Sequence, residues 1–279
     1  MAKVRYAYVT AYMSVLLLML IHTVYGIITN HWAWVGTLLT ILPIFGFFMW
    51  LFLPSVARTP EYLGVPMGII GLGLLIALAG YVMASDVSLF AVLYSSLNLL
   101  FWFGYVFWYS RFGRSVPKQL RVGNTLPNFT AEDGQGNPVS AASLAGQKNL
   151  LMFYRGNWCP LCMSQVAEIA GLYRELDARG VNVTFISPQP HEFTKELADK
   201  FDVPFRFWVD AGNHAARQLG IVNELGVPMG ISGYDPDTVY PTVVITDEQG
   251  EILLLDATDN YRLRPEPQTF LDFFDQRAV

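Results

Sequence analysis

The chain has 279 residues, which suits two modest domains, and 53% of them are hydrophobic, more than an ordinary water-soluble protein has. Residues 1–121 hold seven basic and two acidic residues, a balance of +5, so the net charge of −5 leaves −10 on residues 122–279. Such an acidic second half is excluded from binding nucleic acid through its phosphates, and two cysteines are too few for a disulfide-stapled fold.

Four long apolar stretches occupy the first 110 residues. A helix needs about 20 mostly apolar residues to cross the hydrocarbon core of a bilayer. Stretches of this kind run over residues 8–28, 32–53, 66–84 and 87–109. The first is too long for a signal peptide and lacks a convincing cleavage site, so we expect it to be retained. The sequence therefore predicts an α-helical membrane domain of four transmembrane helices over residues 1–110.

Basic residues fall on one side of these predicted helices. Lys3 and Arg5 precede the first helix, Arg58 lies in the second loop, and four more follow the fourth helix, whereas the first and third loops have none. Because loops rich in Lys and Arg stay in the cytoplasm, we expect a multi-pass cell-membrane protein with its N-terminus and its second domain on the cytoplasmic side. This orientation depends on Ser85 and Asp86 forming a true loop.

The predicted spans offer little chemistry of their own. His22 and Asn98 are the polar side chains of interest, and a hydrogen bond between helices explains each better than a functional site does. Close helix packing is predicted by glycines at positions 64, 68, 71, 73 and 80. The spans have no cysteine, so they cannot pass a disulfide across the bilayer by thiol exchange. We therefore interpret this domain as an anchor in the lipid bilayer.

A basic linker, residues 111–125, leads to a domain over residues 126–279 with a mixed α/β pattern. Apolar runs predict strands over residues 150–154, 181–186, 205–209, 240–245 and 251–255. Helical spacing predicts helices over residues 160–179, 191–201, 213–219 and 265–276. This order predicts a mixed central sheet with helices on its faces. A long loop is predicted over residues 222–239. A lid over the active site and a plain insertion are equally good interpretations of it.

Both cysteines lie in one motif, Cys159-Pro160-Leu161-Cys162, directly after the first predicted strand and at the start of a helix. The free N–H groups and positive dipole end of a helix N-terminus stabilise a thiolate and lower the pKa of its thiol. Pro160 suits the first helical turn because its missing N–H is not needed there. One sulfur can attack a partner and the other can resolve the mixed disulfide, so the motif predicts redox chemistry.

Two stretches carry a family resemblance. Residues 153–162, FYRGNWCPLC, and residues 240–252, YPTVVITDEQGEI, resemble the peroxiredoxin-like group of the alkyl hydroperoxide reductase and thiol-specific antioxidant superfamily that keeps a thioredoxin-type C-x-x-C. The resemblance covers about residue 126 to the end and implies a thioredoxin-like fold. It also implies that Pro241, next to Tyr240, is a cis-proline that faces the cysteine pair.

The sequence departs from that family just before the cysteines. Peroxiredoxins have a proline and a Thr or Ser seven and three residues ahead of the peroxidatic cysteine. Aligned on Cys162 these places hold Arg155 and Cys159, and aligned on Cys159 they hold Met152 and Gly156. The missing hydroxyl argues against efficient peroxide reduction. The register that matches the Thr position to Cys159 makes Cys162 the equivalent of the peroxidatic cysteine. By the logic of thioredoxins we instead expect Cys159, nearer the exposed helix end, to be the nucleophile and Cys162 to be the resolving thiol.

Three further residues have two interpretations each. Arg155 either stabilises a thiolate or a peroxide oxygen, or it is a surface arginine. Trp158 either shields the active sulfur or simply packs. Arg217 matches the later arginine of peroxiredoxins, but its place on a helix favours a solvated side chain. Half of a zinc site is disfavoured for the cysteine pair, because zinc usually takes four protein ligands and no histidine has matching spacing.

The leading hypothesis is a membrane-anchored thiol–disulfide oxidoreductase that reduces protein disulfides or small oxidants and is itself reduced by a cellular thiol. One alternative is a thiol-dependent peroxidase, an antioxidant enzyme for hydroperoxides near the membrane. Another is a non-enzymatic redox sensor or scaffold in a membrane complex. None of these hypotheses calls for a cofactor or a metal, and none involves nucleic acid.

Overall fold

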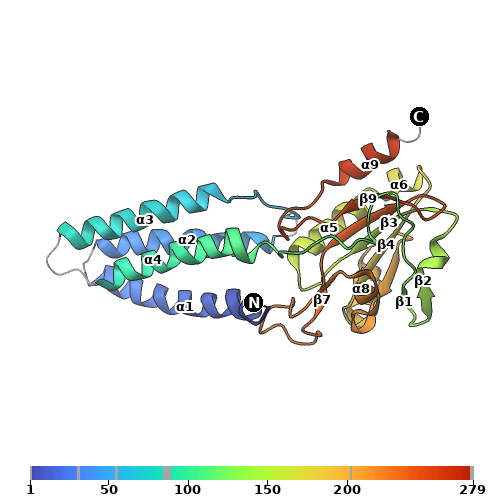
Figure 1. Ribbon diagram of the computed structural model, residues 1–279. Helices are drawn as coiled ribbons and strands as arrows, with labels where there is room; N and C mark the ends of the chain where they lie inside the picture. Colours follow the sequence, from blue (N-terminus) through green and yellow to red (C-terminus); the bar gives the residue numbers. More distant parts are fainter. Residues whose placement is uncertain (1, 30–31, 54–55, 84–88, 202, 277–279) are drawn as a thin grey trace.

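The computed structural model describes residues 2–29, 32–53, 56–83, 89–201 and 203–276, which form a helical bundle and an α/β domain (Figure 1). The bundle consists of α1 (Ala2–Ile28), α2 (Ala33–Leu51), α3 (Gly64–Met83) and α4 (Leu89–Phe103), the last continued by a π-helical segment (Gly104–Tyr109). All four helices are long and apolar enough to cross a membrane. The break expected at Ser85 and Asp86 lies outside the described residues.

Small and polar side chains hold the bundle together. Gly36 of α2 and Gly73 of α3 meet so closely that a Cβ on Gly73 would lie 2.6 Å from the Gly36 carbonyl oxygen. Asn98 of α4 donates to Thr40 of α2 at 2.8 Å and accepts from Tyr12 of α1. The prediction that Asn98 bonds between helices is therefore confirmed.

The other predicted packing residues of the bundle divide into two groups. Gly80 also packs against α2, at Ala33, whereas a Cβ on Gly64, Gly68 or Gly71 would meet nothing within 4 Å. Close packing is therefore confirmed for Gly73 and Gly80 and wrong for the other three, which lie on open faces of α3. The His22 ring on α1 hydrogen-bonds the Tyr94 hydroxyl of α4 at 3.0 Å, so it too joins two helices.

The soluble domain is built on a seven-stranded sheet of order β2-β1-β5-β4-β3-β8-β9. Its strands are β1 (Thr130–Glu132), β2 (Pro138–Ser140), β3 (Lys148–Phe153), β4 (Val181–Ser187), β5 (Arg206–Val209), β8 (Thr242–Thr246) and β9 (Ile252–Asp256). β3, β4 and β5 run parallel, and β8 pairs antiparallel with β3 and β9. The predicted thioredoxin-like domain with a mixed sheet is confirmed.

Helices cover both faces of this sheet. They are α5 (Pro160–Gly171), α6 (Tyr173–Asp177), α7 (His191–Lys200), α8 (His214–Leu219) and α9 (Pro267–Asp275). Alternate residues of β3 enter different cores. Leu150 and Met152 join the core that contains α5 and α9 residues, whereas Leu151 and Phe153 join the core that contains α8 residues.

Three segments differ from the prediction. The helix expected over residues 160–179 is interrupted at Leu172, where α5 ends and the short α6 begins. The hairpin of β1 and β2 was not predicted. The loop expected over residues 222–239 is bounded by two short paired strands, β6 (Val222–Asn223) and β7 (Thr238–Val239).

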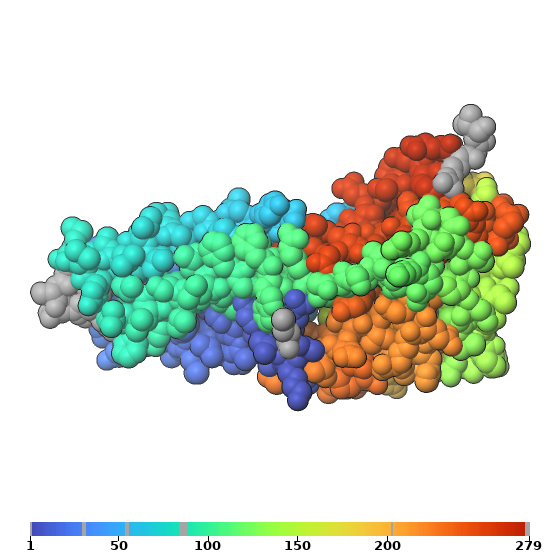
Figure 2. All heavy atoms as spheres, viewed as in Figure 1, coloured from blue at the N-terminus to red at the C-terminus, as the bar shows by residue number. Residues whose placement is uncertain are grey.

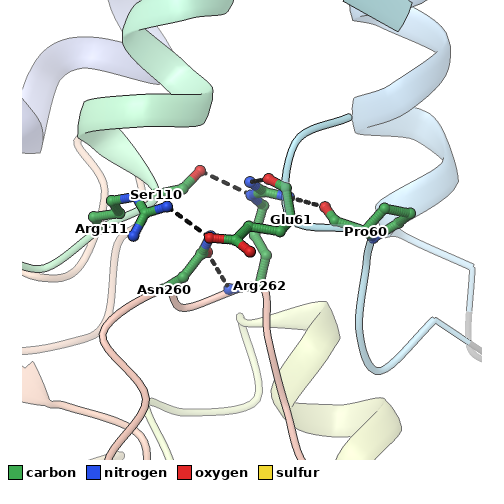
Figure 3. A network of polar contacts seen from close by, with 6 residues as sticks. All are labelled: Pro60, Glu61, Ser110, Arg111, Asn260 and Arg262. Carbon is green, nitrogen blue, oxygen red and sulfur yellow. Dashed lines mark hydrogen bonds and ion pairs between the residues drawn. The ribbon is translucent and has the colours of Figure 1, made fainter. Parts of the chain in front are cut away.

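A buried arginine joins the soluble domain to the ends of the helices (Figure 3). Arg262 is 0% exposed, and its guanidinium donates to Ser110 after α4 at 2.8 Å and to Thr59 in the α2–α3 loop at 2.6 Å. It also donates to the backbone carbonyls of Pro60 at 2.8 Å and Glu61 at 2.7 Å. We call this group of contacts the Arg262 clamp; it fixes the orientation of the domain on the bundle.

Further contacts tie the expected linker and the first helix to the soluble domain. Arg111 pairs with Glu61 at 2.7 Å, and Arg114 donates to the Pro241 carbonyl at 3.0 Å, so residues 111–114 are held rather than loose. Met229 accepts from the Thr10 hydroxyl of α1 at 2.7 Å. The start of α1 therefore abuts the soluble domain, as Figure 2 shows where the blue N-terminal end meets the orange surface.

Candidate active site

The cysteine pair lies where β3 gives way to α5. Cys159 is the N-cap of α5 and Pro160 its first residue, as the sequence predicts. The Cys159 carbonyl accepts backbone N–H bonds from Cys162 at 3.0 Å and from Met163 at 3.1 Å, which closes the first turn. Both cysteines are free thiols, and they are 3% and 0% exposed. The turn brings both sulfurs to the buried end of the helix.

Electrostatics makes the two thiols unequal. Burial alone would raise the pKa of Cys159, but a hydrogen bond from the Cys162 thiol and the positive charges of Arg155 and Arg264 lower it to about 6. Burial and the neighbouring Cys159 sulfur raise the pKa of Cys162 well above its ordinary value. The thiolate form is therefore favoured on Cys159, with the Cys162 thiol as its hydrogen-bond donor.

Arg155 belongs to the site and not to the surface, since the whole residue is only 7% exposed. Its Nη2 donates to the Gly226 carbonyl, and its own carbonyl accepts from the Thr238 hydroxyl at 2.9 Å. Its Nε has no hydrogen-bond partner among the described residues. Of the two interpretations of Arg155, the structure favours a residue near the thiolate over a surface arginine. Arg217, by contrast, is a solvated residue that pairs with Asp237 at 3.0 Å, as expected.

Two residues of the site were not predicted from the sequence. Arg264 adds a second positive charge near Cys159, and its Nε and Nη2 lack partners within the part of the chain that the structure describes. The Tyr261 ring stands 5.7 Å from the Arg155 guanidinium carbon. Both come from the segment between β9 and α9, far from the motif in sequence. No local sequence pattern identifies them. For Arg264, a basic residue in an otherwise acidic domain is a signal that the sequence offers.

The segment before Cys159 is held by a buried amide. Gln189 donates to the Tyr154 hydroxyl at 3.1 Å and accepts from the Asn157 backbone N–H at 2.7 Å. Gly156 has φ +140°, and a Cβ there would lie 2.7 Å from the Trp158 indole nitrogen. Glycine is needed at this position because Trp158 packs directly on its backbone.

Two cavities share part of their walls, and one of them reaches Cys159. One, of about 580 Å³, reaches Cys159, Pro160 and Trp158 and is otherwise lined mainly by apolar side chains of α1 and α2. The other, of about 510 Å³, is lined by more polar residues, among them Arg5 and Tyr240. Four residues line both cavities: Tyr109, Arg155, Pro228 and Tyr261. Arg155 therefore stands between an apolar chamber and a polar one.

Comparison with known proteins agrees with this geometry. Residues 122–254 match the family model described as AhpC/TSA family. Peroxiredoxin Q of Sedum lineare is 30% identical over 111 residues, which are 40% of this chain and 60% of that protein. Putative peroxiredoxin bcp of Haemophilus influenzae is 27% identical over 154 residues, 55% of this chain and 96% of that protein. The soluble domain is peroxiredoxin-like.

Among solved structures, that of Peroxidoxin BcpB from Mycobacterium tuberculosis aligns with a TM-score of 0.47 at 20% identity, over 57% of this chain and 97% of that chain. The chain spans 60% of the Sedum lineare protein and 52% of the matching rice peroxiredoxin Q. The family match begins at the end of the linker, continues through the domain to residue 254 and leaves the four helices outside it.

One feature expected of the peroxiredoxin-like domain is absent. Every described peptide bond is trans, so the cis bond expected before Pro241 is wrong. The chain runs extended from Tyr240 into β8, with the Tyr240 N–H bonded to the Ile221 carbonyl at 2.7 Å. The Pro241 carbonyl is held by Arg114. Since a trans X–Pro bond is favoured by about 0.5–1 kcal/mol in general, nothing in this extended path opposes it.

The surroundings of the Cys159 sulfur also depart from the expected peroxiredoxin pattern. Tyr240 lines the polar chamber and lies 5.2 Å from the Arg114 guanidinium carbon. The missing Thr or Ser hydroxyl has no side-chain replacement in the motif itself. Close to Cys159 in the cavity wall, the Nε of Arg155 has no hydrogen-bond partner among the described residues. In the described part of the chain, no group of three or more His, Cys, Asp or Glu residues is placed to hold a metal ion.

Proposed function

We propose that this protein is a membrane-bound, thiol-dependent peroxidase in which Cys159 attacks the hydroperoxide and Cys162 resolves the oxidised sulfur. One observation carries the proposal: a Cys159 thiol with a pKa lowered to about 6 shares a cavity wall with Arg155, whose Nε lacks a hydrogen-bond partner among the described residues. A thiolate supplies the nucleophile. Free N–H donors can bind the peroxide oxygens and stabilise the negative charge that develops on the leaving oxygen.

The reaction balances on these two cysteines. The Cys159 thiolate attacks the terminal oxygen of ROOH, so that an S–O bond forms, the O–O bond breaks and ROH leaves with a proton from solvent. Cys162 then attacks the sulfur of the Cys159 sulfenic acid; an S–S bond forms and water leaves. The two thiols lose two electrons and ROOH gains them. An external thiol reductant reopens the disulfide by exchange.

The accessibility of the sulfur supports peroxide over a protein disulfide as the oxidant. Cys159 is 3% exposed and lies behind the ends of α1 and α2 and the segment at Met229. Thiol exchange requires the attacked disulfide to approach the thiolate directly. A hydroperoxide can enter such a chamber, whereas a folded partner would need the helices to move. The disulfide oxidoreductase hypothesis therefore becomes the alternative.

Both the N-terminus and the peroxiredoxin-like domain lie at one end of the bundle (Figure 1). If the four helices cross a bilayer, these parts share one side of it, and the distribution of basic residues supports the cytoplasmic side. A reducing compartment would keep the dithiol reduced between turnovers. On this proposal the peroxidase site lies at the membrane surface.

The test uses the full chain, reduced and purified in detergent, mixed with hydrogen peroxide in a stopped-flow instrument. We expect rapid oxidation, followed by tryptophan fluorescence, that is lost in Cys159→Ser. Cys162→Ser should still consume one equivalent of peroxide and stop at a sulfenic acid, which a dimedone label detects. Oxidation at the rate of an ordinary thiol, together with rapid reduction of a protein disulfide, would instead favour the oxidoreductase.

A further inference from the structure

The apolar chamber beside Cys159 is built by both parts of the chain. Its membrane side is formed by Met13 and Leu17 of α1 and by Phe48 and Phe52 at the end of α2. Its other wall is formed by Met229 and Ile231, from the segment between β6 and β7. Met229 is fixed to α1, because its N–H bonds to the Tyr6 carbonyl at 3.0 Å and its carbonyl accepts from Thr10. Neither part alone forms this chamber.

The chamber has the dimensions and the polarity of a binding site. Its volume of about 580 Å³ falls in the usual range of ligand pockets, roughly 300–1,000 Å³. The walls are almost entirely hydrocarbon, and polar groups gather where Cys159 and Arg155 line it. A ligand that fits would therefore be largely apolar and would carry one polar, reducible group.

From these features we infer that the chamber binds the acyl chain of an oxidised membrane lipid and presents its hydroperoxide to Cys159. This inference rests on the proposed peroxidase function and names its substrate class. The membrane side consists of side chains from helices that can span a bilayer. Leu17 and Phe52 are 52% and 64% exposed in the protein alone, so hydrocarbon would cover them in a bilayer. An acyl chain can thus pass from lipid into the chamber without crossing water.

Physical chemistry favours the same direction of approach. A hydroperoxide group on an acyl chain is polar, and keeping it in hydrocarbon without hydrogen bonds costs free energy. Arg155, which lines the chamber together with Cys159, has an Nε that lacks a hydrogen-bond partner among the described residues. An oxidised chain therefore gains hydrogen bonds at the site, whereas an intact chain gains none. This difference selects oxidised over intact lipid.

The second cavity shares Arg155 with the chamber but has neither cysteine in its lining. It lies on the more polar side of Arg155 and is lined by Arg5, Asn223 and Glu224, with no residue of α2. Hydrogen peroxide has no chain to accommodate, whereas an acyl hydroperoxide needs the chamber between α1 and α2. Obstructing the chamber should therefore change the ratio of the two activities.

The test compares variants of the full chain in lipid nanodiscs. Leu17→Trp and Ser14→Trp add bulk to the chamber wall, and Leu18→Trp is the matched control, since Leu18 is 67% exposed on the same helix and does not line the chamber. The measured quantity is the rate constant with a phospholipid hydroperoxide divided by that with hydrogen peroxide. We expect the ratio to fall about tenfold or more in both chamber variants, as for misfit in an apolar pocket, and to stay near wild type in Leu18→Trp.

A binding measurement tests the acyl-chain site independently of the peroxidase reaction. A fatty acid with a diazirine near the middle of its chain is photolysed with the Cys159→Ser protein, and labelled peptides are mapped by mass spectrometry. We expect label on both α1 and the segment at Met229, reduced in Leu17→Trp. Label confined to the outer faces of the spans, or an unchanged activity ratio in both chamber variants, overturns the acyl-chain site. Failure of the wild type to reduce hydrogen peroxide and lipid hydroperoxide, with the label still in place, overturns the peroxidase function instead.

Discussion

The guanidinium carbon of Arg155 stands 4.5 Å from the centroid of the ring of Trp158, the residue just before Cys159. A cation over an aromatic face is attracted by the ring quadrupole, more strongly where water is excluded. Tyr261 adds a second ring on the same cation. Arg155 is therefore held by packing as well as by its bond to Gly226, and its charge stays fixed relative to the thiolate.

Removing this cation should impair the site in two ways. In Arg155→Ala the thiolate loses a stabilising charge and the peroxide loses a donor, so we expect the rate constant with hydrogen peroxide to fall by about 10²-fold or more. Arg155→Lys should recover only part of it, since an ammonium keeps the charge but lacks the planar fork of donors. Stopped-flow oxidation measures both. Arg217→Ala, an exposed arginine in the same domain, is the control, and an equal loss there would refute a local role.

The reactivity of Cys159 should follow a pKa of about 6. Alkylation by iodoacetamide at limiting reagent should be nearly constant from pH 7 to 8 and should fall as the pH drops through 6. Because the folded pKa lies below the ordinary thiol value, the stabilisation from the thiolate is complete above that ordinary value and is also lost as pH falls through 6. Cys162→Ala removes the hydrogen-bond donor and should move the alkylation midpoint upward. A midpoint near the ordinary thiol value in the wild type would contradict this.

Gly156 should not tolerate a side chain. Gly156→Ala places a methyl group 2.7 Å from the Trp158 indole nitrogen at a backbone φ that L residues rarely adopt. We expect a loss of about 1–3 kcal/mol in the free energy of unfolding and a changed Trp158 fluorescence spectrum. The control is Gly171→Ala at the end of α5, where the added methyl group meets nothing within 4 Å. If both variants unfold at the same temperature, the tight packing at Gly156 is refuted.

The Arg262 clamp should contribute more to the free energy of unfolding than the neighbouring ion pair of Arg111 and Glu61. Arg262→Met leaves buried carbonyl and hydroxyl groups without their donor, and each unsatisfied group costs about 1–3 kcal/mol. Arg111→Ala breaks only the half-exposed pair with Glu61, for which we expect about 0–1 kcal/mol. Thermal unfolding in detergent ranks the two variants. We also expect faster proteolysis between residues 111 and 125 in Arg262→Met, and equal melting temperatures would contradict the clamp.

Features set by neighbours along the chain were predictable. The four apolar helices follow from composition alone. The placing of Cys159 as N-cap and Pro160 as first residue of α5 follows from the strand before them and the helical spacing after them. The β1–β2 hairpin also had a local signal, the turn-forming Asp-Gly-Gln-Gly-Asn at residues 133–137, which the prediction did not use.

Features set by contacts between distant segments were not predictable. Arg264 and Tyr261 reach the site only because the chain returns from β9 past the cysteine pair. The apolar chamber requires α1, α2 and the segment at Met229 to meet, and no pattern within any one of them indicates this. The cis bond at Pro241 was transferred from other thioredoxin-like folds, and a likeness of folds does not determine the isomer of one peptide bond.

The Arg262 clamp keeps the soluble domain from swinging on a flexible linker, because it bonds the domain to the ends of the helices. With its helices in a bilayer, the reactive sulfur would stay at one depth and meet only what diffuses within the adjoining leaflet. Its encounters with lipid would then be two-dimensional. Turnover of such substrates should follow their mole fraction in the membrane and not their bulk concentration, so that adding inert phospholipid slows the reaction while adding buffer does not.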